Sequence, residues 1–163
     1  MNLPAVVFKA IDPALGMLPP SMDSPRARVM LLAIGLQESR FEHRRQIGGP
    51  ARGFWQFEQG TQASRGGVWG VYLHEASRPH MRTLCVSRGV LFDPYAVYVA
   101  IEQDDVLAAG MARLLLWTDP RPLPNVDDTD SSWALYLRTW RPGKPHPSTW
   151  PAFHRRASEQ VAQ

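Results

Sequence analysis

Proline and glycine are the residues that most constrain this sequence. The chain of 163 residues contains 15 prolines and 12 glycines, spread along most of its length. Proline cannot continue the interior of a helix or a central strand, and glycine weakens both. The segments between these residues are short, and apolar side chains recur in them at helical spacing more than in alternation. The sequence therefore predicts a mainly α-helical fold of short helices, with at most a small β-hairpin.

The clearest predicted helix runs from Pro25 to about Ser39. Ser24 is a typical N-cap residue, and proline is favoured at the first helical position that follows it. Side chains three and four residues apart share one face of a helix, so the pattern predicts a core-facing stripe. This stripe comprises Ala27, Leu31, Ile34, Glu38 and Phe41. One of its members is a carboxylate, which is unusual on an apolar face.

Capping residues indicate two longer helices in the second half of the chain. Asp93 can cap a helix that begins at Pro94 and continues to Trp117. Ser131 or Ser132 can cap another, which ends before a Pro-Gly pair. Weaker helical patterns lie at residues 4–15, at 61–76 and from 150 onward.

The length of the chain favours a single domain over residues 1–163, because one core can cover this many residues. Within it we expect an N-terminal helix and linker (1–23), a motif-bearing core (24–144) and a C-terminal segment (145–163). No run approaches the ~20 apolar residues that span a bilayer, so membrane insertion is not expected. The first residues lack the basic region of a signal peptide, which predicts synthesis in the cytoplasm without one.

Charge and ligand-type residues exclude several classes of function. The formal net charge of +3 is too small an excess to predict nucleic-acid binding, and the short basic clusters read as solvated faces. The five histidines show no metal-binding spacing, so neither a metal site nor any other cofactor is expected. A single cysteine, Cys85, excludes an intrachain disulfide and reads as a small buried hydrophobe.

Glu38 is the strongest candidate for chemistry. A carboxyl group on an apolar face loses hydration, and this raises its pKa because the charged form is disfavoured. A carboxylic acid that stays protonated near neutral pH can donate the proton that glycosidic cleavage requires. The alternative is a glutamate at a helix end that bends toward solvent or pairs with Arg40, Arg44 or Arg45. The spacing alone leaves both interpretations open.

The residues around Glu38 carry a family resemblance. The segments concerned are Glu38-Ser39-Arg40-Phe41, Gly53-Phe54-Trp55-Gln56-Phe57 and Gly60-Thr61. This pattern resembles the lysozyme-like superfamily of lytic transglycosylases and goose-type lysozymes, in which a helix ending in Glu-Ser-x-Phe precedes a loop and a Gly-Leu-Met-Gln-like segment. Downstream, Asp93-Pro94 followed by Gly110, and Tyr136 before a Pro-Gly turn, resemble the later blocks of that superfamily. The sequence departs from the superfamily pattern at two places. Phe54-Trp55 replaces the aliphatic pair of the superfamily, and Leu137-Arg138 replaces the Asn-Ala that follows its tyrosine.

The resemblance implies a lysozyme-like α-helical domain that cleaves peptidoglycan glycan strands, and we expect it to act as a monomer. The basic, then Gly-rich, then aromatic pattern of residues 42–57 predicts an irregular loop or small hairpin there. The resemblance also implies that Glu38 is the catalytic acid/base and that Ser39 orients the sugar or the glutamate. Gln56 would bind an N-acetylated sugar, and the hydroxyl of Tyr136 would lie near Glu38. With no signal peptide, we expect a phage or prophage product that reaches the bacterial cell wall through a holin or within a virion. The alternative is an inactive virion structural or wall-binding protein of the same fold.

Three further features of this region permit two interpretations each. Trp55 and Phe57 can stack on sugar faces or simply fill the core. Glu58 is the first candidate for a second carboxylate, since Asp93 is better placed as a helix cap and the aspartates at 127–130 as a solvated loop. A transglycosylase needs no second carboxylate, so hydrolase and lyase both remain open. The basic run at 42–46 is a solvated loop or a patch that binds the wall.

Overall fold

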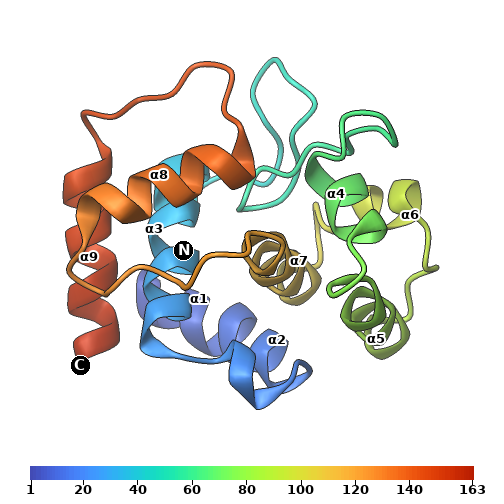
Figure 1. The fold of residues 1–163 in the computed structure, drawn as a ribbon, viewed down its shortest axis with the longest axis horizontal. Helices are drawn as coiled ribbons and strands as arrows, with labels where there is room; N and C mark the ends of the chain where they lie inside the picture. The colour runs from blue at the N-terminus through green and yellow to red at the C-terminus, as the bar shows by residue number, and fades with distance from the viewer.

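Helices form the regular structure of this protein, and the computed structural model, which describes residues 1–163, contains no β-sheet (Figure 1). The predicted mainly α-helical fold is confirmed. The helices are α1 (Leu3–Val6), a π-helical turn (Val7–Ile11), α2 (Asp12–Gly16), a 3₁₀ turn (Pro20–Met22), α3 (Pro25–Ser39), α4 (Gly67–Leu73), α5 (Arg78–Arg88), α6 (Pro94–Ala100), α7 (Asp105–Trp117), α8 (Thr129–Trp140) and α9 (Trp150–Ala162). The segment at 42–57 contains only two isolated β-bridges, which join Arg45 to Arg52 and Arg52 to Phe57.

The predicted α3 begins and ends where the sequence places it. The Ser24 side chain accepts a hydrogen bond from the backbone nitrogen of Ala27 at 3.1 Å, which caps the helix as expected. The predicted single stripe is wrong, because every residue from Val29 to Leu36 is buried. A helix that is apolar on all sides lies inside the core rather than on it. In Figure 1, α8 crosses over α3 and α9 lies beside it, and α9 packs along α3.

The prediction of one continuous helix from Pro94 to Trp117 is wrong, because the segment forms two helices, α6 and α7. Asp93 caps α6 as expected, accepting a hydrogen bond from the backbone nitrogen of Ala96 at 2.9 Å. Asp104 then caps a second helix, α7, through the backbone nitrogen of Leu107, also at 2.9 Å. A short polar side chain that can bond the backbone competes with helix continuation, and here it starts a new helix instead.

Two other predicted boundaries are also corrected. The N-cap of α8 is Asp128, whose carboxylate accepts from the backbone nitrogen of Ser131 at 3.0 Å, so neither Ser131 nor Ser132 caps this helix. A carboxylate is favoured there because the N-terminal end of a helix is positive. Helix α4 occupies only part of the predicted 61–76 segment, and α5 was not predicted.

One hydrophobic cluster runs through the whole chain, from Leu3 to Ala157. The N-terminal helix predicted at residues 4–15 is present over Leu3–Gly16, and residues 1–23 contribute to this cluster and pack against α7. Cys85 is buried and unpaired as predicted, and burial raises the pKa of its thiol to about 11. No helix combines the length and the apolar character needed to cross a membrane.

Candidate active site

Glu38 lies in the last turn of α3, half-buried, and contacts a side chain from a distant part of the chain. The hydroxyl of Tyr136, on α8, donates a hydrogen bond to Oε1 of Glu38. The predicted position of Tyr136 beside Glu38 is confirmed. The alternative ion pair with an arginine is absent, because Arg44 pairs with Asp105 and no salt bridge involves Glu38. The carboxyl group therefore has one neutral donor and no cationic partner.

Tyr136 is held in place by other aromatic rings. Its ring stacks on Trp150 of α9, with centroids 5.2 Å apart and planes 15° apart, and on Trp140 one turn further along α8, at 6.4 Å. The indole nitrogen of Trp140 donates to the backbone oxygen of Trp55 at 2.8 Å, which ties α8 to the loop after α3. Sequence reasoning missed both tryptophans. The i, i+4 spacing from Tyr136 was a usable signal for Trp140, whereas Trp150 had none.

Ser39 fixes the chain at the end of α3 instead of facing a ligand. It is buried, and its hydroxyl donates to the backbone oxygen of Phe54 at 2.6 Å while accepting from the backbone nitrogen of Phe41 at 3.1 Å. The predicted contact of Ser39 with sugar is therefore wrong. The hydroxyl is satisfied inside the protein, where it joins the end of the helix to the aromatic segment and so sets the position of the neighbouring Glu38.

Trp55 and Phe57 belong to the core, which excludes the sugar-stacking interpretation. Their relative exposures are 0% and 2%. The indole nitrogen of Trp55 donates to the backbone oxygen of Leu31 at 2.8 Å, so this ring packs directly against α3. Among the neighbouring rings, only that of Trp140 is both half-buried and packed edge-on against Phe57, with centroids 5.9 Å apart. Trp140 replaces Trp55 and Phe57 as the candidate stacking surface.

The chain reverses after α3 through two residues with left-handed backbone conformations, Arg40 (φ 55°) and Phe41 (φ 56°). The reversal folds the ring of Phe41 back onto Gly35, where an added Cβ would lie 2.0 Å from Cζ of that ring. The same ring packs edge-on against Phe54 and Trp55, with centroids 5.5 Å apart in both pairs. The absence of a side chain at Gly35 thus makes room for the turn that follows Glu38.

Gln56 keeps one polar atom available. Its backbone is left-handed (φ 51°), and its side-chain nitrogen donates to the backbone oxygen of Gly53 at 2.8 Å. Oε1 forms no hydrogen bond within the protein and is not among the buried unpartnered atoms. An amide oxygen of this kind can accept from the N–H of an acetamido group. The structure shows no direct contact between Gln56 and Glu38.

The surroundings of Glu38 raise its pKa from an ordinary value of 4.5 to about 7. Burial is the largest cause, because it disfavours the charged form. The negative charge of the exposed Glu58 acts in the same direction, and the hydrogen bond from Tyr136 opposes it. Of the other candidate carboxylates, Asp93 and Asp128 cap helices, while Asp127 and Asp130 are exposed. Glu58 is therefore the candidate second carboxylate whose charge reaches Glu38.

The basic run at 42–46 attaches the loop to α7 and its N-terminal flank. Arg44 forms a two-pronged ion pair with Asp105, at 2.9 and 2.8 Å, and its guanidinium lies over the ring of Phe54 at 4.3 Å. Arg45 pairs with Glu102. Because both arginines are engaged by carboxylates, the interpretation as a free wall-binding patch is wrong for them, and the run has a structural use.

Comparison with known proteins does not identify a relative of this chain. No protein-family model, no curated protein and no solved structure matches the chain. No group of three or more His, Cys, Asp or Glu side chains is placed to hold a metal ion. The chemistry of the site must therefore be inferred from Glu38 and its neighbours.

The pKa of Glu38 makes the stability of the fold depend on pH. Unfolded, Glu38 ionises near 4.5, whereas the folded protein holds this proton to about pH 7. Between these values the folded state binds more protons, so the free energy of unfolding decreases as pH rises. Above pH 7 the fold carries an ionised, half-buried carboxylate, which costs about 2 kcal/mol after solvent screening.

Glu38→Gln removes this cost. We expect thermal melts of the variant and the wild type to coincide near pH 4, and the variant to melt roughly 4–8 °C higher near pH 8.5. A difference in melting temperature that does not change with pH would contradict the raised pKa.

Proposed function

We propose that this protein cleaves the β-1,4 bond between N-acetylmuramic acid and N-acetylglucosamine in peptidoglycan, with Glu38 as the general acid and base. The observation that carries the proposal is the state of the Glu38 carboxyl group. It is half-buried, it contacts one hydroxyl and no cation, and its pKa of about 7 keeps a large protonated fraction at neutral pH. A general acid of glycosidic cleavage needs these properties.

In the first step the proton of the Glu38 carboxyl moves to the glycosidic oxygen while the bond from that oxygen to C1 of the muramic sugar breaks. The carboxylate that remains is stabilised by the hydroxyl of Tyr136. In a transglycosylase, Glu38 then takes the proton of the C6 hydroxyl as its oxygen closes on C1 to give a 1,6-anhydro sugar. In a hydrolase, water attacks C1 instead and gives its proton to a second carboxylate, for which Glu58 is the candidate because its charge acts on Glu38.

The polar and aromatic groups at the end of α8 and in the segment at 53–57, which Trp140 joins, suit an N-acetylated sugar. Trp140 offers a half-buried ring beside Tyr136, and Oε1 of Gln56 is a free acceptor. Aromatic faces pack on the C–H surfaces of sugars, while an amide oxygen can accept a hydrogen bond from the N–H of the acetamido group. These two residues are the substrate contacts that we propose beside the catalytic pair.

Digestion of purified peptidoglycan sacculi, with the released muropeptides weighed by mass spectrometry, tests this proposal. Anhydro-muropeptides, lighter by one water than the reducing form, would identify a lytic transglycosylase. Reducing-end muropeptides would identify a muramidase, and Glu58→Gln would then be expected to lower the rate. No release from sacculi of several wall types would overturn the catalytic proposal and leave a non-catalytic wall-binding or virion structural role.

A further inference from the structure

A second polar site lies at the opposite end of α3 from Glu38. It is a pocket of about 430 Å³ between the N-terminal end of α3, the C-terminal half of α7 and the segment that follows α7. Ser24, at the start of α3, lines it, and the 14 residues from there to Glu38 span about 21 Å of helix. This pocket is therefore separate from the candidate active site.

The unusual residue of the pocket is Arg113. It lies in α7 with only 2% exposure, and its Nε donates to the backbone oxygen of Met22 at 2.7 Å. Its Nη1 is buried and has no hydrogen-bond partner, and its Nη2 forms no hydrogen bond either. A guanidinium group carries five N–H donors, and leaving such donors unpaired in the interior is costly. Burial also lowers the pKa of Arg113 to about 10, as expected of a cation without a compensating anion.

The charged groups around Arg113 do not supply that anion. Asp23 is close enough to act on its charge, but the carboxylate of Asp23 is engaged by Arg28 at 2.8 and 3.0 Å. Asp119, the carboxylate that lines the pocket, accepts from Arg138 at 2.9 Å and from the backbone nitrogen of Arg121 at 3.1 Å. Both acids are therefore already satisfied by other donors.

Two more arginines and a helix end add positive character to the pocket. Arg26 and Arg121 line it, both largely exposed, and neither forms an ion pair. Ser24 accepts from the backbone of α3, which leaves its hydroxyl hydrogen free to donate. The N-terminal end of a helix of 15 residues contributes further partial positive charge at the same place.

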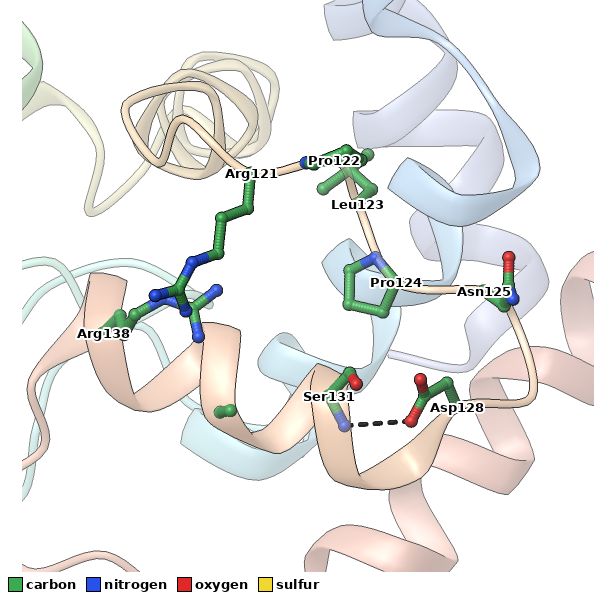
Figure 2. A pocket seen from close by; sticks show the side chains of 9 residues that line it. Arg121, Pro122, Leu123, Pro124, Asn125, Asp128, Ser131 and Arg138 are labelled. Atoms are coloured by element: carbon green, nitrogen blue, oxygen red, sulfur yellow. Dashed lines mark hydrogen bonds between the residues drawn. The ribbon is translucent and has the colours of Figure 1, made fainter.

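The positive surface continues into a neighbouring pocket of about 420 Å³, which shares Arg121. Figure 2 shows the side chains of Arg121 and Arg138 extending into this second pocket from opposite sides, above the capping bond of Asp128. Arg121 thus lines both pockets.

We propose that the pocket around Arg113 binds a phosphate group, with its oxygens accepting hydrogen bonds from Arg113, Arg26 and Arg121. A tetrahedral oxyanion offers several acceptors in different directions, which suits a pocket lined by three guanidinium groups and a helix N-terminus. The phosphate can be free or can belong to a phosphodiester polymer, since both present the same oxygens. This site does not depend on the proposed peptidoglycan activity.

Isothermal titration calorimetry of the full-length chain with inorganic phosphate, at low and constant ionic strength, tests this site. Arg26→Gln and Arg121→Gln change exposed residues and are expected to leave the fold intact, while each weakens phosphate binding about tenfold. Arg155→Gln, an exposed arginine on α9 far along the chain, is the matched control and should bind phosphate as the wild type does. Titration with dimethyl phosphate separates the two sources: binding of the diester identifies a polymer linkage, whereas binding of inorganic phosphate alone identifies the free ion.

Arg113→Met gives a readout that a merely structural role would not produce. Without phosphate the variant should melt higher than the wild type, because a buried cation that has no anionic partner is gone. Phosphate should raise the melting temperature of the wild type and not that of Arg113→Met. No binding, or equal loss of affinity in Arg155→Gln and the pocket variants, would overturn the proposal. If Arg113→Met does not fold, the exposed variants decide the outcome.

Discussion

Glu38→Gln is expected to lower the rate of muropeptide release from sacculi by a factor of about 100 or more. The variant keeps the shape of the side chain, and the amide oxygen can still accept the hydrogen bond from Tyr136. What it loses is the proton that passes to the glycosidic oxygen. Because the fold should be intact, and more stable than the wild type above neutral pH, the loss of activity would be chemical and not structural.

The matched control is Glu75→Gln, which neutralises an exposed carboxylate outside the site and should digest sacculi at the wild-type rate. Wild-type activity should also decline as the pH rises through about 7, because the acid form of Glu38 is lost there. A Glu38→Gln variant that releases muropeptides at the wild-type rate would remove Glu38 from the role proposed for it.

Gly35→Ala is expected to have the largest effect on the fold. The added methyl group would lie 2.0 Å from Cζ and 2.3 Å from Cε1 of Phe41, far inside van der Waals contact. Phe41 cannot move away freely, because its left-handed backbone and its contacts with Phe54 and Trp55 hold it. Overpacking at such a site costs about 3 kcal/mol, which corresponds to a melting temperature lower by roughly 10 °C.

Gly16→Ala is the control for this substitution, because a Cβ at that helical position meets nothing within 4 Å. It should be neutral or slightly stabilising. Denaturant unfolding of both variants provides the comparison. Adding Phe41→Leu to Gly35→Ala should recover part of the loss, since the smaller side chain relieves the collision. Equal stability of the two alanine variants would show that Phe41 yields at little cost.

Local chemistry explains which parts of the fold the sequence could predict. The start of α3 follows from Ser24 and Pro25, and the start of α6 follows from Asp93 and its proline, because a cap acts over three residues. The break at Asp104 was missed because an aspartate in the polar run from Glu102 to Asp105 is equally compatible with a helix residue that faces solvent. Only its bond to Leu107 distinguishes the two.

Contacts between distant segments explain what the sequence could not predict at the site. The proximity of Tyr136 to Glu38 came from the resemblance, and no spacing argument could have joined residues 98 positions apart. The burial of Trp55 and Phe57 depends on α3 and α8 packing over them, which their own sequence does not encode. The same limit applied to Arg44, whose partner on α7 lies 61 residues away.

The all-round apolar surface of α3 has a consequence for biosynthesis. This helix leaves the ribosome well before α7 and α9, the helices that pack against it in the native state. Until those helices have been synthesised, the nascent chain exposes the apolar surface of α3. Folding intermediates with exposed apolar surface aggregate or bind chaperones. Substitutions that weaken the packing of α9 on α3 should therefore reduce the yield of soluble protein in cells before they reduce the activity of each correctly folded molecule.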